Sequence, residues 1–403
     1  MVIKLIFLLA SIKLLWYNNK NTERGETTMY KSFKIRLYPT KEQEILFKKH
    51  IGCCRFIYNY MVDLQLKARI NKEKYISKFN MIRLLTPLKK LTDFYWLNEV
   101  SNTSLQIICS DVHQAFTNYF QKRNNYPKFK SKHKSKAIFP VCANRFYFTD
   151  NYVKIQKCGL VKYKTDFDIP IGNNICKFIN PRISYINEKW LLTFNIEYEN
   201  QVQELNDFSM GIDLGIKELA VVSCNNQKFV FHNINKSKKM RDIKKKIQTI
   251  NRNMARKFTT NGKQYSHNYE KERLKLKKLY ARQTGIRDNY LHQTTRKLVN
   301  LKPKRVVMEA LNVANMVKNK YLSSSIWEQK FYTFIQFMKY KCENMGIEFI
   351  QADRYYPSSK TCSCCGNIKK DLKLSDRTYK CECCGLEIDR DLNAARNLEK
   401  YIA

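Results

Sequence analysis

The pattern of apolar and polar residues changes its period several times along this chain of 403 residues. Near the start, Phe33, Ile35 and Leu37 alternate with Lys34 and Arg36. Side chains of a strand point alternately to its two faces, so a period of two predicts a half-buried strand. We therefore expect the chain to enter its fold through a strand.

A helical pattern follows, from residue 41 to about residue 122. Pro87 lacks a backbone N–H and is expected to divide this helical stretch. Apolar side chains recur near its end at the spacing of one helix face, at Ile108, Val112, Phe116 and Tyr119. Such a stripe is typical of packing against a core, and we give it no other role.

Short strands are predicted next, between residues 126 and 198, including 145–149 and 190–198. A strand, a helical insertion and further strands suggest an interrupted β-barrel. The mostly polar segment 201–208 is the expected domain boundary.

Two acidic residues belong to predicted strands beyond that boundary. Asp213 lies in the segment 209–215, which predicts a strand, a turn near Gly215 and a second strand to about residue 223. Glu309 closes the β-branched run 305–309, which is typical of a buried strand. For each acid alone, a cap or a surface carboxylate is the alternative role.

Four cysteines near the end of the chain have the spacing of a structural zinc ribbon. The pairs are Cys362 with Cys365 and Cys381 with Cys384, and Gly366 and Gly385 follow them at turns that favour a positive φ. Chance cysteines in metal-free turns are the alternative to a zinc site. Two further cysteines could compete as ligands, but the two-residue spacing favours the outer four. The surplus pair is Cys364 and Cys383.

An acidic helix start follows the ribbon at Asp389, Arg390 and Asp391. Two strand acids and one acid at a helix start could converge and hold two divalent cations about 4 Å apart, which is suited to phosphodiester cleavage. Carboxylates favour Mg²⁺. Asp389 could instead simply cap a helix running from about residue 392 to 401.

The net charge of +39, from 74 basic and 35 acidic residues, points to a polyanionic partner. A membrane-surface protein is the alternative, although the charge is spread along the chain. Lys236–Lys257 and Tyr269–Leu298 are basic helices that could contact phosphate or form solvated faces. In Lys122–Lys136, aromatic residues among lysines suit base stacking, with a disordered basic loop as the alternative.

The scattered cysteines outside the ribbon suit a reducing cytosol better than a disulfide framework. The apolar run 5–12 is too short to span a bilayer, and a signal peptide is the alternative for it.

These motifs together resemble the TnpB family, the OrfB-type proteins of bacterial insertion sequences, which are related to the compact type V CRISPR effectors. The resemblance begins near Tyr30, and it implies that residues 1–28 are a dispensable extension that precedes the true start. It is most specific where the cysteine pairs precede residues 389–395. The segments that carry it, in family order, are 33–43, 51–59, 126–131, 211–215, 309–313 and 353–397.

The resemblance implies an α+β multidomain fold, in which a wedge β-barrel with a helical insertion precedes an RNase H-like (RuvC) nuclease domain with an inserted zinc ribbon. It implies a catalytic triad of Asp213, Glu309 and Asp391, with Asp389 as the runner-up. Asp391 is preferred because the family's Asp stands two residues before an Asn, here Asn393. Ala310 departs from the Asp or Asn that often follows the family's Glu.

The implied domains are a 29–40 wedge strand, a 41–125 helical recognition lobe, a 126–205 wedge barrel, a 206–357 nuclease part, a 358–388 ribbon and a 389–403 nuclease helix. The implied cofactors are two Mg²⁺ and one structural Zn²⁺.

The implied activity is that of an RNA-guided DNA endonuclease of a transposable element, with guide RNA and double-stranded target DNA as partners in a bacterial-type, nucleoid-associated cytoplasm. The alternatives are a nuclease-silent RNA-guided regulator or transposition accessory, and a strand-transferring transposase, for which no local nucleophile motif is present. The candidate nucleic-acid contacts are Lys128, Lys130, Lys132, Lys244, Lys245, Lys246, Arg252 and Arg287.

Overall fold

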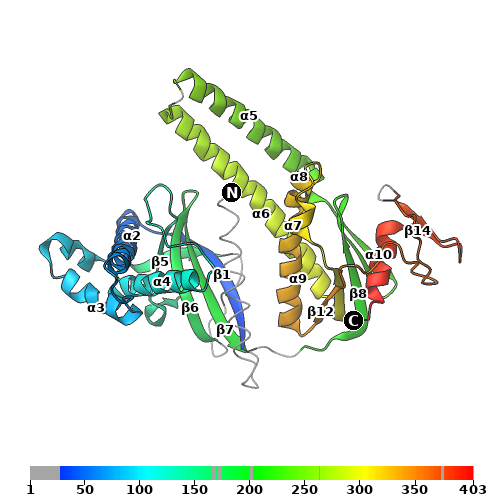
Figure 1. The fold of residues 1–403 in the computed structure, drawn as a ribbon, viewed down its shortest axis with the longest axis horizontal. Coiled ribbons are helices and arrows are strands. Elements are labelled where there is room, and N and C mark those ends of the chain that lie inside the picture. Colours follow the sequence, from blue (N-terminus) through cyan, green and yellow to red (C-terminus); the bar gives the residue numbers. More distant parts are fainter. Residues whose placement is uncertain are drawn as a thin grey trace. The chain divides into compact units, whose positions relative to one another are not determined.

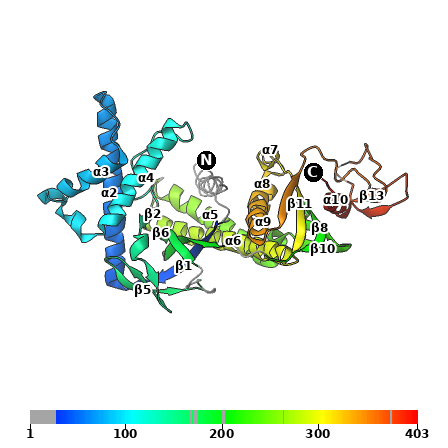
Figure 2. The ribbon, with the colours of Figure 1, turned by 90° about the horizontal axis from the view of Figure 1, so that it is seen from below.

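The structure is a computed structural model, which describes residues 28–165, 169, 175–199, 203–262, 264–373 and 376–402. Two compact units divide the chain after Asn200, next to the polar segment 201–208 (Figure 1, Figure 2). The expected dispensable extension lies outside the described residues, apart from Thr28 at its end.

The first unit combines an antiparallel sheet with a helical region that follows the first strand of that sheet. Its elements are β1 (Thr28–Tyr38), α2 (Lys41–Ile70), α3 (Lys78–Leu88), the short helix η1 (Thr92–Glu99), α4 (Asn102–Phe120), β2 (Ala137–Pro140), η2 (Ala143–Arg145), β3 (Tyr147–Phe148), β4 (Tyr152–Ile155), β5 (Gly159–Lys164), β6 (Ile175–Ile186) and β7 (Lys189–Glu199).

The seven strands are hydrogen-bonded in the order β2-β6-β7-β1-β5-β4-β3. β1 lies in the middle and pairs with β7, a strand that follows it more than a hundred residues later, so the two ends of the unit close on each other. In this register Phe33 is opposite Phe194, and their rings stack with centroids 5.5 Å apart. β2 and β3 are the end strands of the described ladder, and its closure into a barrel stays a prediction.

The predicted alternation in the first strand is confirmed, because Phe33, Ile35 and Leu37 are all buried. The predicted helix start is confirmed as well. Thr40 and Gln43 form a capping box, in which the Gln43 N–H donates to Thr40 Oγ1 and the Thr40 N–H donates to Gln43 Oε1. This reciprocal pair satisfies two backbone N–H groups that would otherwise lack partners at the helix start.

The helical stretch is interrupted twice. α2 ends at Ile70, and Lys72 then adopts a left-handed φ of 58°, a break that the apolar pattern did not indicate. Pro87 lies in the last turn of α3, which ends one residue later. The core stripe of α4 is confirmed, with Ile108, Val112 and Phe116 buried and the fourth member, Tyr119, half-buried.

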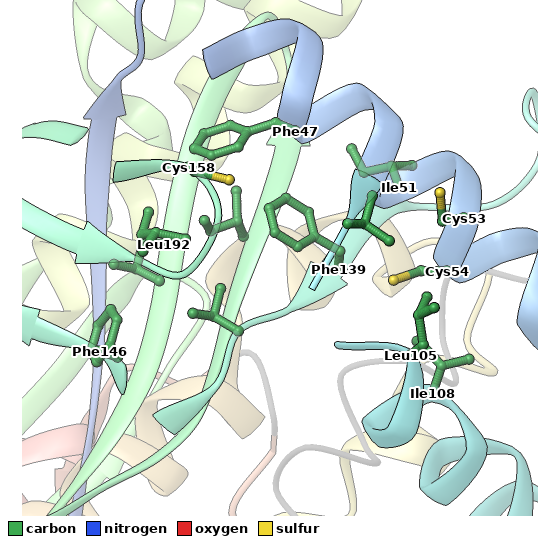
Figure 3. Close-up of a cluster of buried hydrophobic side chains, with 14 of the residues drawn as sticks. Phe47, Ile51, Cys53, Cys54, Leu105, Ile108, Phe139, Phe146, Cys158 and Leu192 are labelled. Atoms are coloured by element: carbon green, nitrogen blue, oxygen red, sulfur yellow. The ribbon is translucent and has the colours of Figure 1, made fainter. Parts of the chain in front are cut away.

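The core of the first unit lies between the helices and the sheet (Figure 3). Phe47 of α2 is fully buried and meets Phe139 of β2 and Trp190 of β7, with ring centroids 5.5 and 5.0 Å away. Edge and tilted contacts of this kind add to the stabilisation from apolar burial. They fix α2 on the sheet.

The second unit is a five-stranded mixed sheet covered by helices on both faces. Its elements are β8 (Asn206–Leu214), β9 (Glu218–Cys224), β10 (Gln227–His232), the short helix η3 (Ile234–Lys236), α5 (Lys238–Thr260), α6 (His267–Val299), β11 (Pro303–Glu309), α7 (Val313–Met316), α8 (Ser323–Gln329), α9 (Phe331–Met345), β12 (Glu348–Ala352), β13 (Thr378–Lys380), β14 (Glu387–Asp389) and α10 (Arg390–Glu399).

The strand order is β10-β9-β8-β11-β12, in which β8, β11 and β12 are parallel and β9 runs against both of its neighbours. The predicted strands through Asp213, to about residue 223 and up to Glu309 are all present. α6 and α9 pack on one face of the sheet and α10 on the other (Figure 1). α5 and α6 form a long hairpin, which a small apolar cluster holds together.

Strand alternation assigns each residue of β8 and β11 to one of these faces. Met210 and Ile212 belong to the cluster with α6 and α9, whereas Val307 of β11 belongs to the cluster with Leu398 of α10. Asp213 and Glu309 alternate with the residues of the first cluster and therefore lie on the α10 face.

Candidate carboxylate site and cysteine cluster

The two strand acids lie near the carboxyl ends of β8 and β11, which are neighbouring strands of the five-stranded sheet. β8 and β11 are parallel neighbours, and their register pairs Ile212 with Met308. Asp213 and Glu309 each follow this pair directly, on the same face of the sheet. Neighbouring parallel strands thus bring together two acids that are 96 positions apart in the sequence.

Gly211 allows α10 to lie directly on this part of β8. A Cβ atom at Gly211 would stand 2.0 Å from the Ala395 carbonyl oxygen and 2.3 Å from the Glu399 nitrogen. No side chain fits in that space, so only glycine permits the contact. At the same, C-terminal end of the helix, the Glu399 carboxylate accepts hydrogen bonds from the Ser223 hydroxyl and the Asn225 N–H. The helix is held against β8 and β9.

The two acids at the start of α10 have different surroundings. Asp389 is the N-cap, and its Oδ1 accepts the Leu392 N–H at 3.0 Å. Asp391 lies in the first turn and is half-buried. The cap that the sequence allowed for Asp389 is therefore present.

The electrostatics show that the three predicted acids are neighbours. Burial and then the charges of Asp391 and Glu309 raise the pKa of Asp213 to about 8. Burial also raises the pKa of Glu309 and of Asp391. With a pKa of about 8, Asp213 holds its proton at neutral pH. The negative charges of its two neighbours disfavour the loss of that proton. Carboxylates crowded in this way favour a bound cation.

Arg390 lies among these acids and was not singled out by the sequence. Its positive charge acts to lower the pKa of Asp213, Glu309 and Asp391 alike. It partly offsets the repulsion among them. The sequence does show a basic residue between two acids. A single arginine in an acidic motif, however, does not indicate which carboxylates its charge affects.

The four predicted ribbon cysteines form a tight cluster. Their sulfur atoms all lie within 4.8 Å of one another, with Cys362 and Cys384 at 3.6 Å and Cys365 and Cys381 at 3.5 Å. Tetrahedral zinc with Zn–S bonds of about 2.3 Å separates its sulfurs by roughly 3.8 Å, so the cluster fits this ion. The surplus cysteines are both exposed and lie outside it.

The two cysteine knuckles have the same backbone hydrogen bonds. The Gly366 N–H donates to the Cys362 carbonyl and the Gly385 N–H to the Cys381 carbonyl, both at 3.0 Å. Both glycines have the predicted positive φ, 77° and 72°. The Cys384 N–H is the main cause that lowers the pKa of Cys381 to about 6, which favours the thiolate that zinc binds.

Two buried asparagines join α10 to the first knuckle. Asn393 donates to the Thr361 carbonyl at 2.7 Å and accepts the Ser363 N–H at 2.9 Å. Asn397, one turn later, donates to the Ser358 and Thr361 carbonyls. The residues flanking Cys362 are thus fixed to the helix that carries Asp391. In the sequence, Asn393 served only to mark the preferred acid, Asp391, and no local pattern indicated this contact.

The candidate nucleic-acid residues fall into three groups. Lys128, Lys132, Lys245, Lys246 and Arg252 are exposed. Lys244 and Arg287 instead both face Glu328 of α8, at 2.7 and 3.7 Å, and only 12% of the Arg287 side chain is exposed. Lys130 is half-buried. Local sequence could not reveal an acid that is more than forty positions away.

Two general observations bear on partners. Each of the thirteen cysteines whose side chains the structure describes is a free thiol. Among the described helices, none has an apolar stretch long enough to cross a membrane.

Family models match three parts of the chain. Residues 29–74 match the "Helix-turn-helix domain" of the OrfB proteins of IS605, residues 193–320 match the OrfB "Probable transposase" of IS605, and residues 331–398 match the "Cas12f1-like, TNB domain".

Curated relatives match over nearly the whole length. A "Putative RNA-guided DNA endonuclease" of Streptomyces pristinaespiralis is 30% identical, and the match covers 91% of this chain and 88% of that protein. A protein with the same description, InsQ of Escherichia coli K12, is 27% identical over 91% of both chains. Among solved structures, Cas12f1 in complex with sgRNA and target DNA is similar in fold, with a TM-score of 0.57 and 15% identity, over 92% of this chain and 99% of that one.

Proposed function

The chain belongs to the TnpB family of OrfB-type insertion-sequence proteins, which are related to the compact type V CRISPR effectors, and on this premise we propose that it is an RNA-guided DNA endonuclease of a transposable element. The observation that carries the proposal is that Asp213 and Glu309 lie near the carboxyl ends of neighbouring parallel strands, and that the charges of Glu309 and Asp391 both act on Asp213. Relatives that match the chain over most of its length bear the same description.

The three carboxylates are the proposed ligands of two Mg²⁺ ions. Their oxygen atoms are the ligand type that Mg²⁺ prefers, and the raised pKa of Asp213 marks a site where negative charge lacks compensation. Two bound Mg²⁺ would supply an activated water and stabilisation of the leaving oxygen in phosphodiester hydrolysis. Asp213 must lose its proton to act as a ligand, and Arg390 helps because its charge favours the ionised form.

The cysteine cluster is the proposed site of one structural Zn²⁺. Four thiolates complete a tetrahedron and leave no open position for catalysis. Through Asn393 and Asn397, the ribbon would hold the start of α10 where Asp391 faces β8.

The domain assignments follow from the same premise. Three adjacent parallel strands, β8, β11 and β12, with an antiparallel β9 support an RNase H-like (RuvC) domain over 206–357 and 389–403, with the ribbon at 358–388. The seven-stranded antiparallel sheet supports the wedge, 29–40 and 126–205, around a helical recognition lobe at 41–125.

The proposed partners are a guide RNA and double-stranded target DNA, in the cytoplasm at the nucleoid. The excess of 74 basic over 35 acidic side chains supports polyanion binding, and the exposed lysines Lys128, Lys132, Lys245 and Lys246 are free to follow phosphates. Base pairing would supply sequence specificity while the protein reads a short flanking motif.

The test begins with the protein purified together with co-expressed RNA. The RNA is sequenced, and Mg²⁺-dependent cleavage is measured on a plasmid library that carries the matching target with randomised flanks. We expect cleavage that depends on one discrete RNA and on one flanking motif. Bound RNA without cleavage would favour the nuclease-silent regulator, and joining of transposon ends would favour a transposase.

The triad is tested in the same assay with Asp213→Ala. We expect cleavage to disappear while the guide RNA stays bound, because the substitution removes a metal ligand and leaves the basic surface intact. Asp207→Ala is the matched control, since Asp207 stands at the other end of β8 with 90% of its side chain exposed. Unchanged cleavage by Asp213→Ala would refute the triad.

A further inference from the structure

A small pocket of about 40 Å³ opens in the first unit, where α2, α4, β6 and the segment before β2 meet. Part of its wall is apolar and comes from Ile51, Cys54 and Ile108, which Figure 3 labels between α2 and α4. The polar residues of its lining are Arg55, Asp111, Lys130, Ser135, Lys136 and Arg182.

The pocket has an excess of positive charge. Its one acid, Asp111, accepts two hydrogen bonds from the Arg182 guanidinium, at 2.8 and 2.9 Å. The structure gives no ion pair for Arg55, Lys130 or Lys136 within the residues it describes. Three cations therefore line a small concave site whose acid is already paired.

Lys130 is held in this site by its neighbours. The Asn59 side chain accepts the Lys130 N–H at 2.7 Å and donates to the Lys130 carbonyl at 2.9 Å. The Lys130 ammonium then lies 3.4 Å from the centre of the Tyr58 ring, and burial lowers its pKa. Burying an ammonium in this way is unfavourable unless an anion joins it.

We propose that this pocket binds one backbone phosphate of the nucleic acid that the protein carries, with Arg55, Lys130 and Lys136 as its hydrogen-bond donors. The Arg182 and Asp111 pair would keep the pocket open and fix its shape, because a bidentate contact holds both side chains in one geometry. This inference rests on the proposed function and specifies where one phosphate is held.

The size of the pocket suits a phosphate. An oxygen-sized group needs about 10–15 Å³ of such volume, so 40 Å³ accommodates about three of them, as many as the free oxygens and one ester oxygen of a phosphodiester. The exposed lysines Lys128 and Lys132, on the same segment, would instead meet phosphates singly at the surface.

The test uses the full-length complex with Arg55→Gln, Lys136→Gln and the double variant. Lys136 is exposed, so its substitution leaves the packing intact, and thermal melting verifies the fold of each variant. The affinity for the co-purified RNA, and for matched duplex DNA bound to the RNA complex, is measured at several salt concentrations. Lys67→Gln is the control, because Lys67 is exposed and paired with Asp63.

A shared phosphate predicts a particular salt dependence. Each single substitution should weaken binding about tenfold, and the slope of log K against log salt should fall by no more than about 0.7–0.9, even in the double variant. Two independent phosphate contacts would double that change. Additive slopes, or wild-type affinity and slope in all three variants, would overturn the inference.

The source of the phosphate is identified by neutralising one linkage at a time with methylphosphonate, in the RNA or in the DNA. Neutralising one particular linkage should lower the affinity of the wild type. Neutralising that same linkage should leave the affinity of the double variant unchanged. No such linkage in either strand would overturn the inference. If the wild type shows guided cleavage and the pocket variants bind nucleic acid as it does, only the phosphate site in the pocket is refuted. If the wild type binds no nucleic acid, the proposed function is refuted as well.

Discussion

The cysteine cluster and the carboxylate site, both in the second unit, are assembled in opposite ways. The four thiols lie on two short knuckles, and their sulfurs converge within 4.8 Å. The three carboxylates come from two strands and a helix start, and burial together with the charges of Asp391 and Glu309 raises the pKa of Asp213 to about 8. In the described chain, only the cysteines converge as closely as a metal requires.

The difference shows that contacts between near neighbours determine the geometry of the cysteine cluster, whereas contacts between distant residues determine that of the carboxylate site. A knuckle closes over a few residues, and its backbone hydrogen bonds and glycine are encoded within it. The carboxylate site depends on Gly211 and on the asparagines that tie α10 to the ribbon. The ribbon therefore holds α10 in place, and the position of Asp391 at the start of α10 depends on the ribbon.

Removing a ribbon ligand should have the largest effect. Cys381→Ser is expected to abolish zinc binding and to lower cleavage by roughly 100-fold or more, since structural zinc supplies folding free energy and the ribbon positions Asp391. Zinc content by elemental analysis and cleavage rates measure both effects. Cys364→Ser is the matched control, because this neighbouring thiol is exposed and outside the cluster. Equal zinc loss in both variants would contradict the ligand assignment.

A side chain at Gly211 should separate the carboxylates and leave the ribbon intact. Gly211→Ala puts a Cβ 2.0 Å from a backbone oxygen, so α10 must move, at a cost of about 3 kcal/mol. We expect a lower melting temperature and weaker cleavage, with zinc content unchanged. Gly285→Ala serves as control, because a Cβ there would meet no atom within 4 Å. Wild-type cleavage by Gly211→Ala would show that the close approach is unnecessary.

Breaking the asparagine link should have a smaller effect. Asn393→Ala leaves the Thr361 carbonyl and the Ser363 N–H without their partner, and residues that orient metal ligands typically contribute 10–100-fold to activity. We expect kcat to fall within that range while RNA affinity stays at the wild-type value. Asn393→Asp, which keeps the acceptor for Ser363, should recover part of the rate. A loss of RNA affinity instead would indicate general unfolding.

The smallest effect should be a pH dependence that only the carboxylate site shows. The folded pKa of Asp213, about 8, exceeds its unfolded value, so without divalent metal its contribution to stability is lost as pH rises towards 8. Mg²⁺ displaces the proton, so it should raise the melting temperature more at pH 8.5 than at pH 6.5. Asp213→Asn should remove the difference. An equal Mg²⁺ effect at both pH values would argue against Asp213 as a ligand.

The sequence predicted those features that depend on near neighbours. The cysteine spacing identified all four members of the cluster, and alternation identified the buried face of β1. The strands of Asp213 and Glu309 were also recognisable, because the turn near Gly215 with the apolar run beyond it, and the β-branched run that ends at Glu309, are local patterns.

Features that depend on distant contacts could not be predicted in this way. The contact of Gly211 with α10, and the effect of the Arg390 charge on three carboxylates, exist only once strands and helix have packed. In the same way, Lys244 and Arg287 belong to predicted basic helices, but in the fold both form ion pairs with Glu328. A basic run predicts charge and does not reveal which of its members are already paired.

The most direct test of the central claim compares the two acids at the start of α10. Asp391→Asn and Asp389→Asn are assayed together for guided DNA cleavage and for Mn²⁺ binding by electron paramagnetic resonance. Asparagine is a good N-cap, so Asp389→Asn should keep the helix, the bound metal and most of the cleavage. Asp391→Asn should lose both metal and cleavage. Loss of metal and cleavage in Asp389→Asn, with Asp391→Asn active, would contradict the account.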